Sequence, residues 1–418
     1  MKAFVYKIAQ SILALLRRLG FDFYGQLIRT YPRRKLNSAL SGKTSRSFQL
    51  GLVLDLPAAF SLSQVGRDFI DKLSQTDIPF SVLDISVPGT HYAKITENEY
   101  GKYRDFLTLT FSPKAIIQFA AGDPVVGAKQ SVFFTPFWEF ESGLFETRPN
   151  FFSGTRGAIV FSKFCHKFFS ANAPEGYPVS YLPYPFPFHN INIDRKATRE
   201  KFGIPQNAFA VFFNFDIRSG YDRKNPEATL LAFSKAFQDK PNGRLVFKIS
   251  SADSAPEKMQ SLHTQAEKLG LSEKLIIITD YLTHDGILAL TGSCDVYLSL
   301  HRGEGLGLGM LEAMSVNVPV IATAYGGNTD FCNDTTACMV PYKLVKPKTD
   351  FPHYRTVKLW AEPDINAAAD ALLALYSNPD LRRKKCAAAK SFIGDFYSQE
   401  NFEKELQKFL DEIGRAHK

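Results

Sequence analysis

Residues 295–313 of this sequence read DVYLSLHRGEGLGLGMLEA, and they join an apolar strand to a helix through a glycine-rich loop. Glycines stand at alternate positions from Gly303 to Gly309, where the helix is expected to begin. Glycine lets a backbone approach a ligand closely, and the free N–H groups at a helix N-terminus attract anions. Glu304 projects from the loop and Glu312 lies inside the helix, so both carboxylates are suited to accept hydrogen bonds from sugar hydroxyls.

Two plainer interpretations of the same loop stay open at this point. Alternating glycines also mark dinucleotide-binding turns, but such a turn normally follows the first strand of its domain, whereas this loop follows the fourth strand of the second expected domain. Glu312 also suits an ordinary position in the first turn of a helix, where a carboxylate complements the helix dipole. Taken singly, each residue fits its plainer role, and only the spacing of the two favours a ligand site.

Strands of continuous apolar character alternate with helices on both sides of this loop. We expect strands at 48–55, 79–85, 115–120, 131–135 and 157–161, and again at 209–215, 244–250, 274–279, 295–300 and 318–323. Helical patterns fall at 64–73, 226–238, 256–269 and 309–316. Such alternation is typical of parallel sheets buried on both faces. The predicted fold class is therefore α/β, with two Rossmann-like doubly wound domains that face a central cleft, where a ligand binds near the carboxyl ends of the strands.

Composition divides the chain into four parts. Residues 1–46 are basic and amphipathic, and residues 47–188 form the first Rossmann-like domain, which ends at the proline-rich stretch PYPFP at 183–187. Proline-dense stretches are typical of linkers. Residues 189–396 form the second domain, and residues 397–418 form a C-terminal helix that we expect to pack back toward the first domain.

Most of the formal net charge of +8 lies in the first 46 residues, which hold ten Lys and Arg but one acidic residue, Asp22. This segment therefore carries +9 and the rest of the chain −1. A nucleic-acid-binding protein spreads its basic residues along a groove, so we expect no nucleic-acid partner. The five cysteines form no C-x-x-C pair and the histidines show no ligand spacing, which predicts a reducing cytoplasmic setting and no protein-held metal.

The basic N-terminal segment is predicted to be a surface helix. Placed on a helix, residues 2–19 gather apolar side chains on one face and Lys7, Arg17 and Arg18 on the other. A basic amphipathic helix lies on anionic membrane surfaces, which predicts a protein at the inner face of the cell membrane. The alternative is a helix that packs on its own domain and leaves its basic face in water.

A basic turn follows the first strand of the second domain, in the stretch FFNFDIRSGYDRKNPEATLLAF at 212–233. Asn225 suits the N-cap of the next helix and Pro226 its first position, which holds Arg223 and Lys224 at the mouth of the helix. Fixed cations at such a place stabilise the charge that grows on a departing diphosphate. The alternative is an Arg-Lys pair that is merely solvated.

Glu304 and Glu312 form an E-x7-E arrangement, and the surrounding EGLGLGMLEAM…PVIAT…GGNTDF resembles the donor-binding signature of the family-4 retaining glycosyltransferases of group 1. The turn with R-K-N-P is similar to a bacterial subgroup that synthesises polysaccharide and lipopolysaccharide. The resemblance implies a GT-B fold and retaining transfer of a hexose from a nucleoside-diphosphate sugar to a hydroxyl of a glycan or lipid-linked acceptor. It implies no cofactor beyond the donor substrate and no obligatory metal. Leu306 and Asn317 depart mildly from the family pattern.

The resemblance also implies roles for the reacting residues. It implies that residues 47–188 form the acceptor-side domain and that residues 189–396 form the nucleotide-sugar-binding domain. The residues implied in catalysis are Glu304, which orients the donor sugar, Lys224 with either Arg218 or Arg223, which stabilise the diphosphate, and Glu139, which contacts the acceptor or the reacting sugar. Trp138 beside Glu139 offers a stacking face, although aromatic core packing explains this region equally well.

Further residues are implied in binding the donor. Glu312 holds the ribose and Tyr281-Leu282 meet the nucleobase. The whole binding set is Arg223, Tyr281, Leu282, Gly305, Leu306, Gly307 and Glu312. Other functions stay open on the sequence alone: a GT-B-fold nucleotide-sugar epimerase or phosphorylase, a non-catalytic carbohydrate or membrane adaptor, and an NAD-dependent oxidoreductase.

Overall fold

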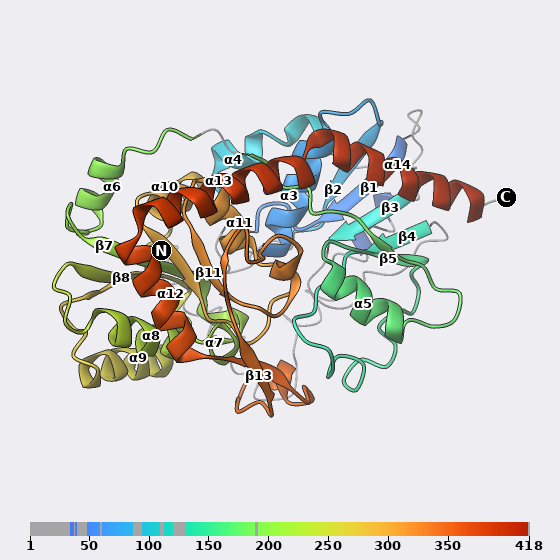
Figure 1. Ribbon diagram of the computed structural model, residues 1–418. Coiled ribbons are helices and arrows are strands. Elements are labelled where there is room, and N and C mark those ends of the chain that lie inside the picture. Colours follow the sequence, from blue (N-terminus) through green and yellow to red (C-terminus); the bar gives the residue numbers. More distant parts are fainter. Residues whose placement is uncertain are drawn as a thin grey trace, which may run out of the picture.

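A computed structural model of the chain describes residues 34–36, 38–39, 48–58, 61–86, 94–108, 113–119, 131–188 and 191–416. Two lobes stand side by side, each built on its own sheet (Figure 1). The last three helices lead from the second lobe to the first (Figure 1). Helix α12 (Ile365–Ser377) lies on the second lobe, α13 (Pro379–Phe396) follows the upper edge of the molecule, and α14 (Gln399–Ala416) lies over the first lobe.

The first domain holds a six-stranded sheet in which every neighbouring pair is parallel. Its strands are β1 (Phe48–Leu54), β2 (Phe80–Asp84), β3 (Pro113–Phe119), β4 (Ser131–Phe134), β5 (Gly157–Val160) and β6 (Val179–Tyr181), in the order β2-β1-β3-β4-β5-β6. Its helices are α3 (Ser61–Leu73), α4 (Glu97–Gly101) and α5 (Lys163–Asn172). The strand side chains whose placement is described are largely buried, as expected for strands covered on both faces.

The second domain holds a parallel sheet of the order β12-β11-β10-β7-β8-β9. Its strands are β7 (Phe209–Asp216), β8 (Gly243–Ser250), β9 (Leu275–Ile278), β10 (Val296–Ser299), β11 (Val320–Thr323) and β12 (Cys338–Val340). Its helices are α6 (Arg195–Lys201), α7 (Tyr221–Lys224), α8 (Pro226–Phe237), α9 (Pro256–Lys268), α10 (His284–Gly292) and α11 (Leu308–Ser315). A separate antiparallel pair consists of β13 (Tyr342–Val345) and β14 (Trp360–Pro363).

The predicted fold class is confirmed, because the chain forms two Rossmann-like domains of parallel strands. All ten expected strands are present, and their ends agree with the expected ends to within two residues. The carboxyl edges of the two sheets face each other, since Ser162 after β5 donates from Oγ to the carbonyl of Gly305 after β10 at 2.6 Å. The short edge strands β6 and β12 and the β13–β14 pair were not predicted from the sequence.

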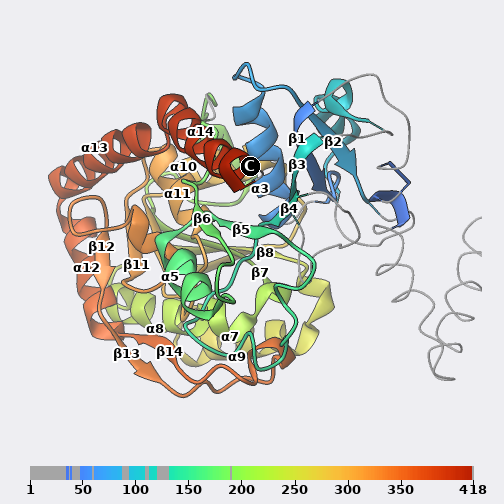
Figure 2. The ribbon, with the colours of Figure 1, turned by 90° about the vertical axis from the view of Figure 1, so that its right-hand side faces the viewer.

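Helix α14 lies against the first domain, beside α3 (Figure 2). The rings of Phe69 on α3 and Phe402 on α14 meet edge to face with their centroids 5.4 Å apart. Lys72, also on α3, donates from Nζ to the carbonyl of Tyr397 at 3.0 Å, immediately before α14 begins. The C-terminal helices therefore tie the two domains together on the side away from the β13–β14 pair.

The end of the basic N-terminal segment packs on the first domain. Leu36 and Ala39 are buried in a cluster with Val53, Leu83 and Ile116. The amphipathic pattern at residues 2–19 lies outside the described residues.

The strand order of the second sheet reverses between β7 and β10. From β7 the chain passes through β8 and β9 in one direction, and it then returns to β10 on the other side of β7. In open α/β sheets, ligands bind outside the carboxyl ends of strands at such a switch point. The loops that follow β7 and β10 are those of the basic turn and the glycine-rich stretch.

Asn225 joins these two loops. Its Oδ1 accepts from the backbone N–H of Ala228 as the N-cap of α8, and its Nδ2 donates to the carbonyl of Leu300 at 2.9 Å. Its φ of 56° lies in the left-handed region, which asparagine tolerates better than most residues. One buried side chain thus fixes both the entry to α8 and the start of the glycine loop.

Asn225→Ala should therefore lower the free energy of unfolding by about 3 kcal/mol, through the lost cap, an unsatisfied buried carbonyl and left-handed strain. Chemical unfolding followed by circular dichroism measures the loss. Asn225→Gly is the matched control, because it removes the same hydrogen bonds without the strain and should cost less. An alanine variant as stable as the wild type would contradict this role of Asn225.

Candidate active site

Glu304 is the centre of a buried ion-pair cluster at the switch point. Its carboxylate accepts a hydrogen bond from the Lys224 ammonium, and its Oε1 lies 3.3 Å from Nη1 of Arg223. The side chains of Glu304, Lys224 and Arg223 are only 12%, 18% and 4% exposed. The structure thus brings together the carboxylate and the cations that were predicted from two stretches of sequence 80 residues apart.

The cluster fixes the charge state of Glu304. Burial raises the pKa of a carboxyl group, but Lys224 and Arg223 outweigh burial here and hold the pKa of Glu304 at about 2. Burial, and then the neighbouring Arg223, lower the pKa of Lys224. Glu304 is consequently ionised at neutral pH, and its charge is balanced inside the protein.

Arg223 is fully engaged by protein groups. Its Nη1 donates to the carbonyl of Gly303 at 2.7 Å and its Nε to the hydroxyl of Tyr354 at 3.0 Å. Its Nη2 donates to the carbonyl of Ser219 at 2.8 Å and lies 3.6 Å from a carboxylate oxygen of Glu139. Arg223 therefore connects both loops of the switch point with the first domain and with the segment between β13 and β14.

Arg218 lies apart from this cluster. Its Nε and Nη2 donate to the two carboxylate oxygens of Asp216 at 3.2 and 2.9 Å, and its side chain is 45% exposed. This hydrogen bonding to Asp216 raises the pKa of Arg218. Of the two candidate arginines, the structure brings Arg223 to Glu304 and leaves Arg218 at the surface beside the end of β7.

Glu139 and Trp138 follow β4 in the first domain. Glu139 faces Arg223 across the domain boundary, with its side chain 23% exposed. Trp138 is buried, donates from Nε1 to the carbonyl of Ser142 at 2.9 Å and meets the Phe140 ring edge to face. The suggestion that Trp138 offers a stacking face is wrong, because aromatic core packing encloses its ring.

The backbone of the first domain lies close to two glycines of the loop. A Cβ on Gly303 would lie 2.7 Å from the carbonyl oxygen of Glu139, and one on Gly305 would lie 3.2 Å from that of Trp138. A side chain at either position would therefore crowd the backbone of the first domain. Gly307 differs, since its φ of 97° lets the chain turn into α11. Leu306 is buried.

Glu312 has a partner that the sequence did not indicate. On α11, its Oε1 lies 2.9 Å from Nε2 of His284, the first residue of α10. Burial lowers the pKa of His284, but the hydrogen bond and charge of Glu312, helped by the charge of Asp68 on α3, outweigh burial and raise it. The histidine was missed because only the packing of α10 against α11 brings it to Glu312.

The remaining binding residues lie after β9. Tyr281 is half exposed and Leu282 partly buried in the segment between β9 and α10. This segment leaves the carboxyl end of β9, so it lies on the same edge of the sheet as the basic turn and the glycine loop. The structure contains no contact that joins Tyr281 directly to Glu304 among the described residues.

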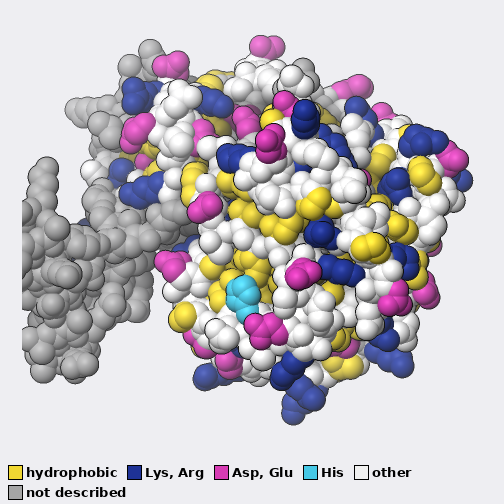
Figure 3. Space-filling view, turned by 90° about the vertical axis from the view of Figure 1, so that its left-hand side faces the viewer, with side chains coloured by type: hydrophobic (Ala, Val, Ile, Leu, Met, Phe, Trp, Pro, Cys, Tyr) yellow, Lys and Arg dark blue, Asp and Glu magenta, His cyan; other side chains and the backbone are white. Residues whose placement is uncertain are grey.

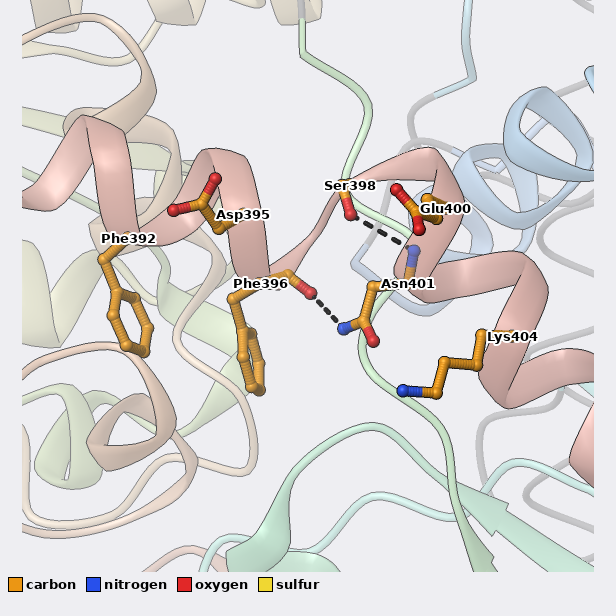
Figure 4. Close-up of a pocket in the computed structure, with 7 residues that line it drawn as sticks. All are labelled: Phe392, Asp395, Phe396, Ser398, Glu400, Asn401 and Lys404. Carbon is orange, nitrogen blue, oxygen red and sulfur yellow. Dashed lines mark hydrogen bonds between the residues drawn. The ribbon is translucent and has the colours of Figure 1, made fainter.

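An open pocket lies elsewhere, at the junction of α13 and α14 (Figure 4). Its lining residues are Phe392, Asp395, Phe396, Ser398, Glu400, Asn401 and Lys404. Asn401 donates from Nδ2 to the carbonyl of Phe396 at 2.7 Å, and its backbone N–H donates to Oγ of Ser398. These polar groups hold the turn between the two helices, and none of the predicted site residues lines the pocket.

No group of three or more His, Cys, Asp or Glu side chains in the described parts of the chain is arranged to hold a metal ion. No described helix is both long and apolar enough to cross a membrane.

Residues 194–350, which include Lys224, Glu304 and Glu312, match the sequence model of the family described as Glycosyl transferases group 1. This part of the chain is similar to the group 1 glycosyltransferases. The chain is also 28% identical over 176 residues to the serotype-specific mannosyltransferase WbdA of Escherichia coli, a match that covers 40% of this chain. The match spans only 20% of the length of that mannosyltransferase.

Solved structures extend the likeness of the fold over both domains. HepE of Anabaena, solved in complex with UDP and glucose, superposes with a TM-score of 0.63 at 12% identity and covers 87% of this chain and 100% of its own. WaaG, a glycosyltransferase involved in lipopolysaccharide biosynthesis, gives a TM-score of 0.56 at 14% identity and covers 87% of this chain and 99% of its own. The expected two-domain GT-B fold is confirmed.

The Glu304 cluster predicts a distinct dependence of stability on pH. A carboxyl group whose folded pKa is depressed from 4.5 to about 2 stabilises the fold above pH 4.5, and this contribution is lost as the pH falls toward 2. Glu304→Gln should lower the free energy of unfolding at pH 7 by about 3 kcal/mol, and the loss should shrink below pH 4.5. Chemical unfolding between pH 3 and pH 8 measures this difference.

Glu405→Gln is the control for this measurement, because Glu405 forms an exposed ion pair with Lys408 on α14. It should change stability by less than about 1 kcal/mol. A Glu304→Gln difference that is the same at pH 3 and pH 7 would show that the carboxylate is not held ionised by its neighbours.

Proposed function

We propose that this protein transfers a hexose from a nucleoside-diphosphate sugar to a hydroxyl group of a glycan or lipid-linked acceptor in the assembly of a surface polysaccharide, with retention at the anomeric carbon. The observation that carries the proposal is the buried Lys224–Glu304 pair at the switch point of a group 1 glycosyltransferase domain. A cation and an ionised carboxylate there match the two needs of the reaction, a diphosphate that leaves and a sugar that must be oriented.

Lys224 and Arg218 are proposed to bind the diphosphate. As the glycosidic bond breaks, negative charge grows on the leaving group, and fixed cations stabilise it without a metal ion or cofactor. All three guanidinium nitrogens of Arg223 donate hydrogen bonds to protein acceptors, so the role proposed for Arg223 is structural. Arg218 is half exposed, and Asp216 is its ion-pair partner. Its guanidinium group can therefore leave Asp216 and bind the phosphate oxygens of the donor, which replaces one anionic partner by another.

Glu304 is proposed to orient the donor sugar. With a pKa of about 2 it carries no proton to donate at neutral pH, so it acts as an acceptor of hydrogen bonds from sugar hydroxyls and not as a general acid. Glu312, held by His284, is proposed to accept from the ribose hydroxyls. Tyr281 and Leu282 meet the nucleobase, and Glu139 on the acceptor-side domain faces the reacting sugar.

A panel of UDP-, GDP- and ADP-hexoses tests the proposed activity. One nucleotide should raise the melting temperature of the protein, and its hexose donor should be hydrolysed slowly and transferred when an acceptor is present. An epimerase or phosphorylase would give an acceptor-independent sugar product, and an adaptor would bind without turnover. Nicotinamide cofactors should leave the melting temperature unchanged. No turnover with any donor and acceptor would contradict the proposal.

The two arginines provide a sharper test of the roles. Arg218→Gln should lower kcat about 100-fold, because a donor to the leaving group is lost, while the melting temperature stays near that of the wild type. Arg223→Gln should lower the melting temperature by several degrees, because buried carbonyls and carboxylates lose their partner. Steady-state kinetics and thermal unfolding on both variants measure the difference. The opposite pattern would exchange the roles of the two residues.

We also propose that residues 1–46 hold the protein at an anionic membrane surface on the cytoplasmic face. The support is the net charge of +9 ahead of a nearly neutral body. Leu36 and Ala39 belong to the buried cluster of the first domain, so a deletion of the segment would also strip core side chains. Substitutions at the basic face of residues 2–19 avoid this difficulty.

Lys7→Gln, Arg17→Gln and Arg18→Gln, combined in the full chain, should weaken binding to anionic vesicles at least about tenfold in sedimentation assays. The matched control combines Lys235→Gln, Lys268→Gln and Lys384→Gln, which remove the same charge from exposed positions on α8, α9 and α13. Equal binding of the two triple variants would refute the N-terminal attachment and leave the proposed transfer reaction untouched.

A further inference from the structure

The antiparallel pair β13–β14, together with the segment between its strands, exposes apolar side chains far more than the rest of the described chain. Five large hydrophobic side chains in the described residues are exposed, and three of them, Tyr342, Leu344 and Leu359, lie in residues 342–360. Their exposed fractions are 37%, 45% and 45%. Single exposed apolar residues are ordinary, but three of five in one short segment mark a surface with a partner.

The same segment is basic. Residues 342–360 contain a single acidic residue, Asp350, against five exposed cations: Lys343, Lys346, Lys348, Arg355 and Lys358. The rest of the chain beyond residue 46 is acidic on balance, so this excess is local. In Figure 3, Lys and Arg side chains project from the lower edge of the molecule, the edge at which Figure 1 places β13.

Few of these cations are neutralised by the protein. Lys358 lies 3.8 Å from a carboxylate oxygen of Glu146, and both side chains are largely in water. Asp350 is itself engaged by Lys258 at 3.5 Å. The other four cations of the segment form no ion pair with a described residue. An exposed cationic surface with protruding aliphatic side chains therefore remains open to a partner.

We propose that residues 342–360, which we call the basic ribbon, dock on the surface of an anionic lipid bilayer. Leucine side chains enter the acyl boundary, while neighbouring lysines keep their ammonium groups at the phosphates. A tyrosine at the edge of such a surface suits the headgroup level. Nucleic acid would bind to the cations and could stack a base on Tyr342, but it offers no apolar environment for the exposed Leu344 and Leu359. The composition of the ribbon therefore favours a bilayer.

The ribbon is joined to the Glu304 cluster by direct contacts. Arg302 in the glycine loop lies over the Trp360 ring at 4.8 Å and donates to both carboxylate oxygens of Glu362 on β14 at 2.7 and 3.0 Å. Tyr354 within the ribbon accepts a hydrogen bond from Arg223. A bilayer bound to the ribbon would thus lie close to the Glu304 cluster. This placement suits a lipid-linked acceptor, and that extension rests on the proposed function. Docking of the ribbon on a bilayer does not depend on the proposed function.

Tryptophan fluorescence tests docking at the ribbon itself in the full chain. The two native tryptophans, Trp138 and Trp360, are buried, so Leu344→Trp adds a probe at an exposed position. Its emission should shift to the blue with vesicles that contain phosphatidylglycerol and stay unshifted with pure phosphatidylcholine. Lys268→Trp on α9 is the control and should not respond to either. An unshifted Leu344→Trp spectrum on anionic vesicles would overturn the proposal, whatever the N-terminal segment does.

Charge and apolar contributions are separated by two further variants. Lys343→Gln, Lys346→Gln and Lys348→Gln, combined, should weaken vesicle binding at least about tenfold relative to the triple control on α8, α9 and α13. High salt screens the charge contribution to vesicle binding, so the binding that remains is apolar. The double variant Leu344→Ser with Leu359→Ser should lack this salt-resistant binding. Vesicle binding equal to the control in both variants, or a loss of oligonucleotide binding in place of vesicle binding, would refute the bilayer as the partner. Circular dichroism confirms that each variant is folded.

Discussion

The structure of the site depends on one buried carboxylate that two cations share. Glu304 stays ionised inside the protein because Lys224 and Arg223 neutralise it, and the buried Lys224 ammonium in turn depends on Glu304. The residues belong to loops that follow β7 and β10, so the ion pairs connect the two strands at which the order of the sheet reverses. The backbone N–H of Gly327 donates to the carbonyl of Glu304 at 2.7 Å, which fixes the loop from a third side.

Arg223 extends this constraint beyond the second domain. Through Glu139 it reaches the first domain, and through Tyr354 it reaches the basic ribbon. The close contact of Gly303 with the backbone of Glu139 makes the same connection by packing. The Glu304 cluster, the first domain and the proposed membrane surface are therefore parts of one contact network.

Much of this was predictable from the sequence, and the failures have physical causes. The ten predicted strands are continuous apolar runs between helices, a pattern typical of parallel sheets. The spacing of Glu304 and Glu312 identified the loop as a ligand site. The sequence could not choose between Arg218 and Arg223, because both lie in one turn and only burial distinguishes them. His284 and Tyr354 were missed because their contacts with Glu312 and Arg223 join distant segments. Strand β13 is mostly exposed, so it lacks the apolar pattern that marks the other strands.

A double-mutant cycle between Lys224 and Glu304 tests the central claim most directly. Unfolding free energies at pH 7 are needed for the wild type, Lys224→Met, Glu304→Gln and the variant that carries both substitutions. If the pair is mutually stabilised as the structure indicates, the double variant should be more stable than the sum of the single losses predicts, by about 2 kcal/mol. Additive losses, with a coupling energy near zero, would contradict the view that this ion pair holds the site together.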